Sequence, residues 1–223
     1  MLATIHKCDR QHVATKPALT PGTRLRNKMR IHLARTDTMH RWLLILSLLS
    51  LPAVADEASR LQQAAFAPQL QHQNTVLERK NQSLLRYLWA DVYAAAFYSE
   101  AQVSPQRALR EQRDRHLELY YFREISKNDV IKAAWVTLER QHSPQVLQPL
   151  REELDRLHAS FVDIRPGDRY GLDYSQATGL RLQRNGEVIF SSQDARLAQL
   201  YFGIWLAPEG LSDELRDALL AER

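Results

Sequence analysis

From Val76 onward, hydrophobic and polar residues alternate with a period of two, a pattern that predicts β-strands. Residues 87–98 (YLWADVYAAAFY) are mostly apolar in both alternating sets. We interpret them as a long central strand, or a bent strand pair, that is covered on both sides. The segment contains three alanines, but its aromatic and β-branched residues favour a strand over a helix. Residues 116–122 (HLELYYF) predict another strand.

Apolar residues at helical spacing predict two helices after these strands. Ser126 and Asp129 form a capping pattern at the start of the first helix, whose apolar stripe includes Ala134 and Leu138. The second helix carries apolar residues that are three or four positions apart: Leu147, Leu150, Leu154, Leu157 and Phe161.

The last third of the chain predicts a meander of three short strands, at 170–174, 180–182 and 188–190. Asn185-Gly186, between the last two, is a strong hairpin signal. Two helices follow, the second starting at Ser212. This order lacks the strand–helix–strand alternation of parallel sheets. The sequence therefore predicts an α+β fold, with helices packed on one face of an antiparallel sheet.

The apolar run at 42–51 (WLLILSLLSL) has the features of a secretory leader. The short basic start Met39-His40-Arg41 precedes it, and Ala53-Val54-Ala55 supplies small residues for cleavage. These features predict a signal peptide at 39–55 and export to a bacterial periplasm. The run is far shorter than the ~20 apolar residues that span a bilayer, so no transmembrane anchor is expected after cleavage.

The predicted cleavage divides the chain into four parts. Residues 1–38 are a disordered extension or the result of a start codon assigned too far upstream. Residues 39–55 are the signal peptide. Residues 56–75, rich in Gln and Ala, form an N-terminal arm, and residues 76–223 form a single domain.

The cleavage also changes the charge of the protein. Residues 1–55 hold nine of the 30 Lys and Arg residues and two of the 26 Asp and Glu residues, so 21 basic and 24 acidic residues remain. The basic isoelectric point of the whole chain, 9.3, is therefore due to the leader. A nucleic-acid partner is not expected. Cys8, the single cysteine, is removed too, which excludes a disulfide or a lipidated cysteine in the mature protein.

Common catalytic and cofactor motifs are not found. His116, His142 and His158 have no His or Cys three or four positions away, and we interpret them as scattered surface residues rather than metal ligands. The sequence has no G-x-S-x-G nucleophile motif and no glycine-rich phosphate loop. We therefore expect neither a metal nor a cofactor.

Arg86 and Asp91 are unusual because they lie in a segment that is otherwise apolar and aromatic. A charge in such a segment is costly unless it is paired or faces water. One interpretation is a structural pair between Arg86 and an acid, or an arginine at the exposed start of a strand. The other is a cationic anchor at the mouth of an aromatic pocket, suited to a carboxylate or phenolate ligand.

Four segments in order resemble bacterial chalcone isomerase-like proteins: LLRYLWADVYAAAFYS (84–99), LELYYFREISKNDVIKAAW (117–135), RPGDRYGLDYSQATGLRLQRNGEVIFS (165–191) and YFGIWLAPEGLSDELRDALL (201–220). Together they span nearly all of residues 76–222. The resemblance implies an open-faced β-sandwich, in which helices cover one face of an antiparallel sheet. This fold agrees with the predicted order of elements.

The resemblance also bears on activity. The plant enzymes of this fold close a chalcone ring with an arginine, a threonine, a tyrosine and an asparagine. Here Arg86 matches the arginine approximately, and Tyr93 occupies the threonine position. Residues 126–141 contain no tyrosine, and Asn128 lies at the helix cap. Most of the catalytic set is thus missing. Non-catalytic relatives bind fatty acids through an arginine and a tyrosine, a requirement that Arg86 and Tyr93 fit better.

We therefore expect a non-catalytic periplasmic protein that binds a small amphipathic, acyl or carboxylate ligand through Arg86 and Tyr93. An ideal strand would place these two residues on opposite faces, so the hypothesis requires a bulge or a bend between them. The alternatives are an isomerase or lyase acting on an enone or phenolic substrate, and an envelope protein with a structural or interaction role. The sequence does not indicate the oligomeric state.

Overall fold

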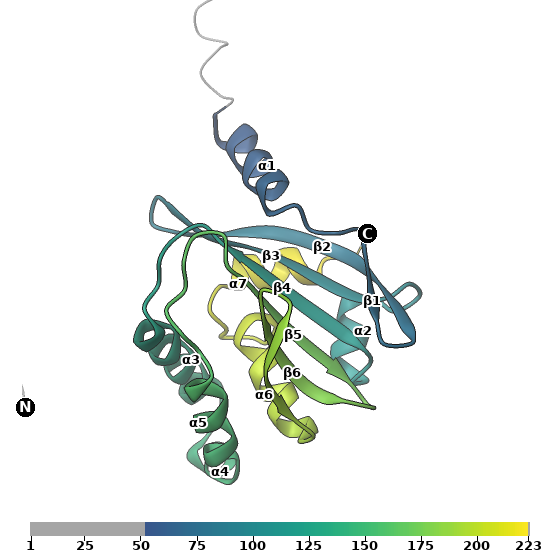
Figure 1. The fold of residues 1–223 in the computed structure, drawn as a ribbon, viewed down its shortest axis with the longest axis vertical. Coiled ribbons are helices and arrows are strands. Elements are labelled where there is room, and N and C mark those ends of the chain that lie inside the picture. The colour runs from purple at the N-terminus through teal and green to yellow at the C-terminus, as the bar shows by residue number, and fades with distance from the viewer. Residues whose placement is uncertain (1–51, 223) are drawn as a thin grey trace, which may run out of the picture. The chain divides into compact units, whose positions relative to one another are not determined.

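Seven strands form one antiparallel sheet in which each strand pairs with its neighbours in the sequence (Figure 1). The computed structural model describes residues 52–222, with side chains from Asp56 onward. The strands are β1 (Gln69–His72), β2 (Thr75–Tyr87), β3 (Ala90–Glu100), β4 (Arg115–Tyr121), β5 (Arg169–Ser175), β6 (Gly179–Arg184) and β7 (Glu187–Ser192).

The helices lie before, between and after the strands. They are α1 (Pro52–Ala64), α2 (Pro105–Arg110), α3 (Lys127–Gln141), α4 (Pro144–Leu147), α5 (Arg151–Ala159), α6 (Ala195–Leu206) and α7 (Asp213–Leu220), with a 3₁₀ turn at Gln148–Leu150. The α3–α5 segment and α6 pack on one face of the sheet around the main hydrophobic core. The predicted α+β architecture is confirmed. No helix in this part of the chain is long and apolar enough to cross a membrane.

Strand β3 is buried on both faces, as its sequence predicts. Tyr93, Ala95 and Phe97 point into the main core beneath the helices. Ala94, Ala96 and Tyr98 point to the other face, where a smaller core includes residues of α1. The side-chain period of two in a strand explains this division. The sheet thus has the expected helix layer on one face and α1 over part of the other.

The segment 87–98 is a strand pair rather than one long strand. β2 ends at Tyr87, β3 begins at Ala90, and Leu88 and Trp89 form the two-residue turn between them. Leu88 and Trp89 are exposed, so the expectation that this whole segment is covered is wrong at the turn. The alternation alone does not reveal the turn, because neither residue is a typical turn former.

The predicted N-terminal parts fall partly outside the described residues. The extension 1–38 and the signal peptide up to Leu51 lie outside them. The segment 56–75, predicted as an arm, contains most of α1 and the edge strand β1. The sheet therefore begins at Gln69, before the boundary expected at Val76.

The helix and turn signals correspond to observed elements. The Ser126 hydroxyl accepts a hydrogen bond from the Asp129 backbone N–H at 3.1 Å, as expected for the cap of α3. All five residues of the predicted leucine-rich stripe are buried. Asn185 and Gly186 both have positive φ, +50° and +86°, as the predicted hairpin turn requires.

The histidine interpretation is wrong for two of the three residues. His116 and His158 are buried, not at the surface. His116 Nδ1 lies 2.6 Å from Asp173 Oδ1, and His72 Nδ1 lies 3.3 Å from the same oxygen. Burial raises the pKa of Asp173, but these two hydrogen-bond partners outweigh it and hold the pKa well below its usual range. Within residues 52–222, no three His, Cys, Asp or Glu side chains are arranged to hold a metal ion.

His158 is expected to make the stability of the protein depend on pH. Burial between Trp135 and Tyr201 lowers its pKa from 6.5 to about 4. The imidazole of His158 takes up a proton near pH 6.5 in the unfolded chain but only near pH 4 in the folded protein. The free energy of unfolding is therefore highest above pH 6.5 and decreases as the pH falls from 6.5 to 4. Each tenfold difference in proton affinity between the folded and unfolded states corresponds to about 1.4 kcal/mol, so the full loss is roughly 3 kcal/mol.

Urea unfolding at neutral pH and near pH 4 measures this loss. His158→Leu should reduce the difference between the two conditions, whereas His142→Gln, a change at a less buried ring, should keep most of it. An unchanged acid dependence in His158→Leu would contradict the assignment.

Candidate ligand-binding cavity

A cavity of about 600 Å³ lies between the sheet and the helix layer. Strands β2 to β6 form one wall, and α3, α6 and the loop before α7 contribute to the other. Its volume is within the ~300–1,000 Å³ that small-molecule sites occupy. Most of the lining is aliphatic or aromatic, and its aliphatic members include Leu85, Val92, Leu119, Leu172, Leu182 and Ile204.

Four tyrosines gather along this cavity from three strands and one helix. They are Tyr93 of β3, Tyr121 of β4, Tyr170 of β5 and Tyr201 of α6. The rings of Tyr93 and Tyr121 are 5.3 Å apart, and those of Tyr121 and Tyr170 are 6.0 Å apart. We call this group the tyrosine cluster. It is the main polar group within the cavity, whose other polar lining residues include Arg86, Asp129 and Ser212.

The tyrosine hydroxyls are poised to donate hydrogen bonds. Burial raises the pKa values of Tyr93, Tyr121 and Tyr201 well above the ordinary value for tyrosine, so all three hydroxyls stay protonated at physiological pH. Trp205 Nε1 donates to the Tyr93 oxygen at 3.0 Å, which leaves the Tyr93 proton free to donate. No hydrogen bond from the described residues reaches the hydroxyl of Tyr121 or Tyr201.

Both predicted ligand-binding residues, Arg86 and Tyr93, border the cavity, but their polar groups point in different directions. Tyr93 pairs with Leu85, and Arg86 pairs with Asp91, which leaves Val92 as a β-bulge. Paired residues lie on the same face of a sheet. Tyr93 and Leu85 therefore face the cavity, whereas Arg86 and Asp91 face α1. A bulge is present between the two residues, but it leaves their side chains on opposite faces and not on the shared face that the hypothesis requires.

The guanidinium of Arg86 forms an ion pair. Its Nε donates to Asp91 Oδ1 at 2.9 Å, and Arg60 of α1 donates to Asp91 Oδ2 at 2.8 Å. Partial burial raises the pKa of Asp91, but the two arginines outweigh this effect and hold the pKa below its ordinary value. Asp56 and Glu57 of α1 lie 3.6 and 3.9 Å from the other Arg86 nitrogens. The geometry thus corresponds to the first interpretation, a structural pair.

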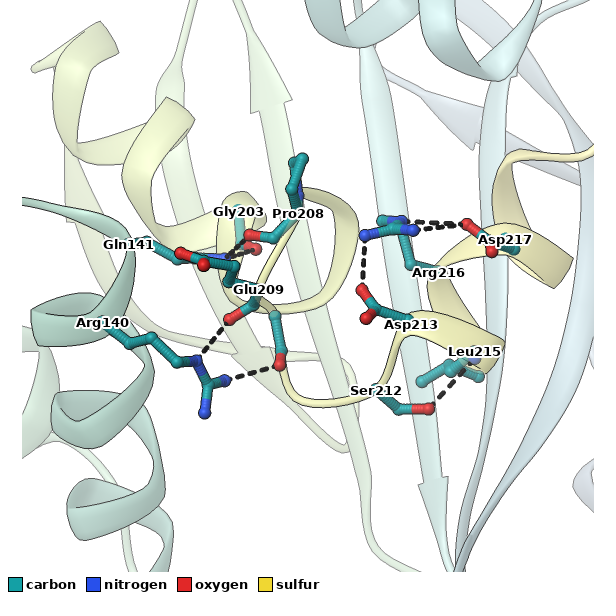
Figure 2. A network of polar contacts seen from close by, with 11 residues as sticks. Arg140, Gln141, Gly203, Pro208, Glu209, Ser212, Asp213, Leu215, Arg216 and Asp217 are labelled. Carbon is teal, nitrogen blue, oxygen red and sulfur yellow. Dashed lines mark hydrogen bonds and ion pairs between the residues drawn. The ribbon is translucent and has the colours of Figure 1, made fainter.

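The helix-side wall of the cavity is held in place from α3 (Figure 2). Arg140 and Gln141, at the end of α3, reach the loop between α6 and α7, which carries the lining residues Leu211 and Ser212. The two side chains donate to four backbone carbonyls at 2.6–3.0 Å, those of Gly203, Pro208, Glu209 and Gly210. Ser212 then caps α7 by accepting from the Leu215 N–H at 3.1 Å. The predicted start of α7 is confirmed.

Sequence reasoning missed three members of the tyrosine cluster. Tyr121 is recoverable from alternation, because it shares a face with Leu117 and Leu119 in the predicted strand. Tyr170 and Tyr201 come from a distant strand and a helix, so only the tertiary structure brings them to the cavity. Asn128, considered for the missing catalytic asparagine, is exposed and does not line the cavity.

The sequence profile of the family described as chalcone isomerase-like matches residues 58–221. The chain belongs to the chalcone isomerase-like family. This membership confirms the family that the four ordered segments predict. The matched region includes the second half of α1 and all of β1, so the family domain of this chalcone isomerase-like protein starts before Val76.

A fatty-acid binding protein of Arabidopsis thaliana has a similar structure. The TM-score is 0.52 at 12% sequence identity, and the match covers 70% of this chain and 90% of that chain. The likeness shows that the chalcone isomerase-like protein shares this fold. A search of curated protein sequences found no relative.

The ion pair predicts that Arg86→Ala lowers stability rather than ligand affinity. The substitution leaves the Asp91 carboxylate with Arg60 as its one close cation, and the pair is partly exposed, so we expect a loss of about 1 kcal/mol in the free energy of unfolding. Thermal denaturation and fatty-acid binding, measured on the same variant, test this.

Arg107→Ala is the matched control, because Arg107 pairs with Glu111 on the exposed side of α2 and its loss should change little. A variant at Arg86 with unchanged melting temperature and weakened binding would instead support the ligand-anchor interpretation.

Proposed function

We propose that this protein binds a small amphipathic ligand, a fatty acid or a similar carboxylate, without transforming it. The observation that carries the proposal is the largely apolar cavity with the tyrosine cluster, in which the hydroxyls of the buried residues Tyr121 and Tyr201 have no hydrogen-bond partner among residues 52–222. A ligand with an acyl chain and a hydrogen-bond acceptor matches this lining. That a protein of the same fold is a fatty-acid binding protein supports the choice of ligand class.

The head group of the ligand is assigned to the tyrosine cluster. The hydroxyls of Tyr121 and Tyr201 have no protein partner among the described residues, so a ligand carboxylate can accept a charge-assisted hydrogen bond from each of them. Tyr93 can donate as well, because its oxygen accepts a hydrogen bond from Trp205 Nε1 and its own proton is left for the ligand. The acyl chain then lies along the aliphatic lining. Arg86 remains at the edge of the cavity, where its pair with Asp91 holds the end of the β2–β3 hairpin.

Removal of two hydroxyls should weaken ligand binding without unfolding the protein. We expect the double substitution Tyr121→Phe/Tyr201→Phe to lower affinity for oleate by about tenfold or more, since a hydrogen bond to a charged group contributes ~1.5–3 kcal/mol. Folding should persist because neither hydroxyl has a protein partner in the described structure. Titration calorimetry measures the change.

Tyr174→Phe provides the control. The Tyr174 hydroxyl donates to Gln112 at 3.2 Å, away from the cavity, so its loss should leave oleate affinity unchanged. No binding of oleate by the unsubstituted protein, or equal affinity in the double variant, would contradict the proposal.

The protein is further proposed to act in the periplasm after removal of residues 1–55. Support comes from the apolar run at 42–51 and from Ala53 and Ala55 at the cleavage positions. The family match begins at residue 58, just after the proposed cut. The new N-terminus would place Asp56 and Glu57 at the start of the remaining α1, where acidic side chains favour a helix.

Intact mass of the protein expressed in a bacterium tests export. The expected product starts at Asp56 and lacks Cys8, and Ala55→Leu should block its formation because the residue before the cut must be small. A full-length cytosolic product that retains Cys8 would contradict this localisation.

A further inference from the structure

The tip of the β2–β3 hairpin presents three consecutive large apolar side chains to solvent. Tyr87, Leu88 and Trp89 are 71%, 82% and 88% exposed. In the part of the chain that the structure describes, the other large hydrophobic residues with high exposure are isolated valines. Single exposed apolar residues are normal, but a contiguous group marks a contact surface. We call Tyr87–Trp89 the hairpin tip.

The backbone of the hairpin tip is strained. Leu88 has a φ of +58°, a conformation that glycine or asparagine adopts readily and that costs a bulky residue about 1–2 kcal/mol. A glycine at this position would remove both the strain and an exposed leucine. Strain retained together with exposure indicates that the leucine side chain itself has a role.

The hairpin tip adjoins the cavity. Tyr87 lies on the cavity side of β2, because it alternates with Arg86, and it lines the cavity. Its side chain is also largely exposed to solvent. Asp129 and Val130 at the start of α3 contribute to the lining from the helix layer. Figure 1 shows the hairpin at the end of the sheet where β4 also leads into α3. A surface in contact with the hairpin tip would therefore lie beside the cavity.

We propose that the hairpin tip inserts into the interface of a lipid bilayer, so that the ligand passes between membrane and cavity without crossing water. Trp and Tyr are the side chains that membrane interfaces favour, and leucine suits the acyl region below. The tip projects as a two-residue turn between β2 and β3. This shape suits insertion into a fluid phase. The transfer of a ligand between membrane and cavity rests on the proposed function. The insertion of the hairpin tip into a bilayer can be tested independently of it.

The charges near the hairpin tip indicate whether insertion requires anionic lipids. The tip contains no charged residue, and the two nearest arginines on the α1 side, Arg60 and Arg86, both pair with Asp91. Asp56 and Glu57 lie close to Arg86 as well. These cations are compensated, so insertion should depend on apolar contact rather than on anionic lipids. Binding to neutral phosphatidylcholine should therefore persist at high salt.

A local probe tests insertion in the full chain. In a Cys8→Ser background, Trp89→Cys carries an environment-sensitive fluorophore, and Val188→Cys on strand β7 carries the same fluorophore as the matched control. With phosphatidylcholine vesicles, the probe at 89 should shift to the blue and the probe at 188 should not. Adding Leu88→Ser to the Trp89→Cys chain should reduce the shift. Because the readout is local, membrane binding by another segment would not imitate it.

Two outcomes would overturn the inference. One is a probe at 89 that stays in water when vesicles are added. The other is a shift that depends on protein concentration without vesicles, which would mean that the hairpin tip contacts a second copy of the chain. Oleate affinity is measured separately on the same labelled proteins, in the absence of vesicles, so it does not depend on whether the hairpin tip inserts. Failure of insertion with intact oleate binding is thereby distinguished from failure of the proposed function.

Discussion

The β-bulge at Val92 determines which side chains reach the cavity. Because successive side chains of a strand alternate between faces, one extra residue reverses the face of everything beyond it relative to the partner strand. The bulge places Tyr93 opposite Leu85 on the cavity side and leaves Asp91 opposite Arg86 on the α1 side. Without it, pairing Asp91 with Arg86 would turn Tyr93 away from the helix layer. The part of the cavity lining that β2 and β3 supply, the ion pair and the hairpin geometry all depend on this one irregularity.

Features that arise from local sequence could be predicted. The alternation in β3 and β4, the leucine stripe of the α4–α5 segment, and the caps at Ser126 and Ser212 all depend on neighbours within a few residues. Asn185-Gly186 is similar, because a two-residue turn with positive φ needs these residue types. The α+β fold followed from the order of such elements.

Features that depend on distant residues or on irregular backbone could not be predicted. The bulge at Val92 and the turn at Leu88 have no signature in residue type. The pair between Arg86 and Asp91 was considered, but not its second arginine, Arg60, which lies 31 positions from Asp91 and comes from α1. His116 resembled a surface residue because its partner Asp173 is 57 positions away. Tertiary contacts of this kind decide where the polar groups of the cavity point.

The sequential order of the strands has a consequence for how the chain folds. Every strand pairs with its neighbours along the sequence, so most of the sheet can grow from contacts of short separation, which favours rapid folding. The exception is the pair β4–β5, whose partners are 49–59 positions apart because α3–α5 lie between the two strands. The hydrogen bonds of longest separation join side chains to the C-terminal end of the chain: Asn81 donates to the carbonyls of Leu219 and Ala221 across 138 and 140 positions, and Gln106 donates to the carbonyl of Leu220 across 114. They require both partner strands or helices to be in place. We therefore expect these contacts to form late, fastening the two ends of the domain after the sheet has assembled.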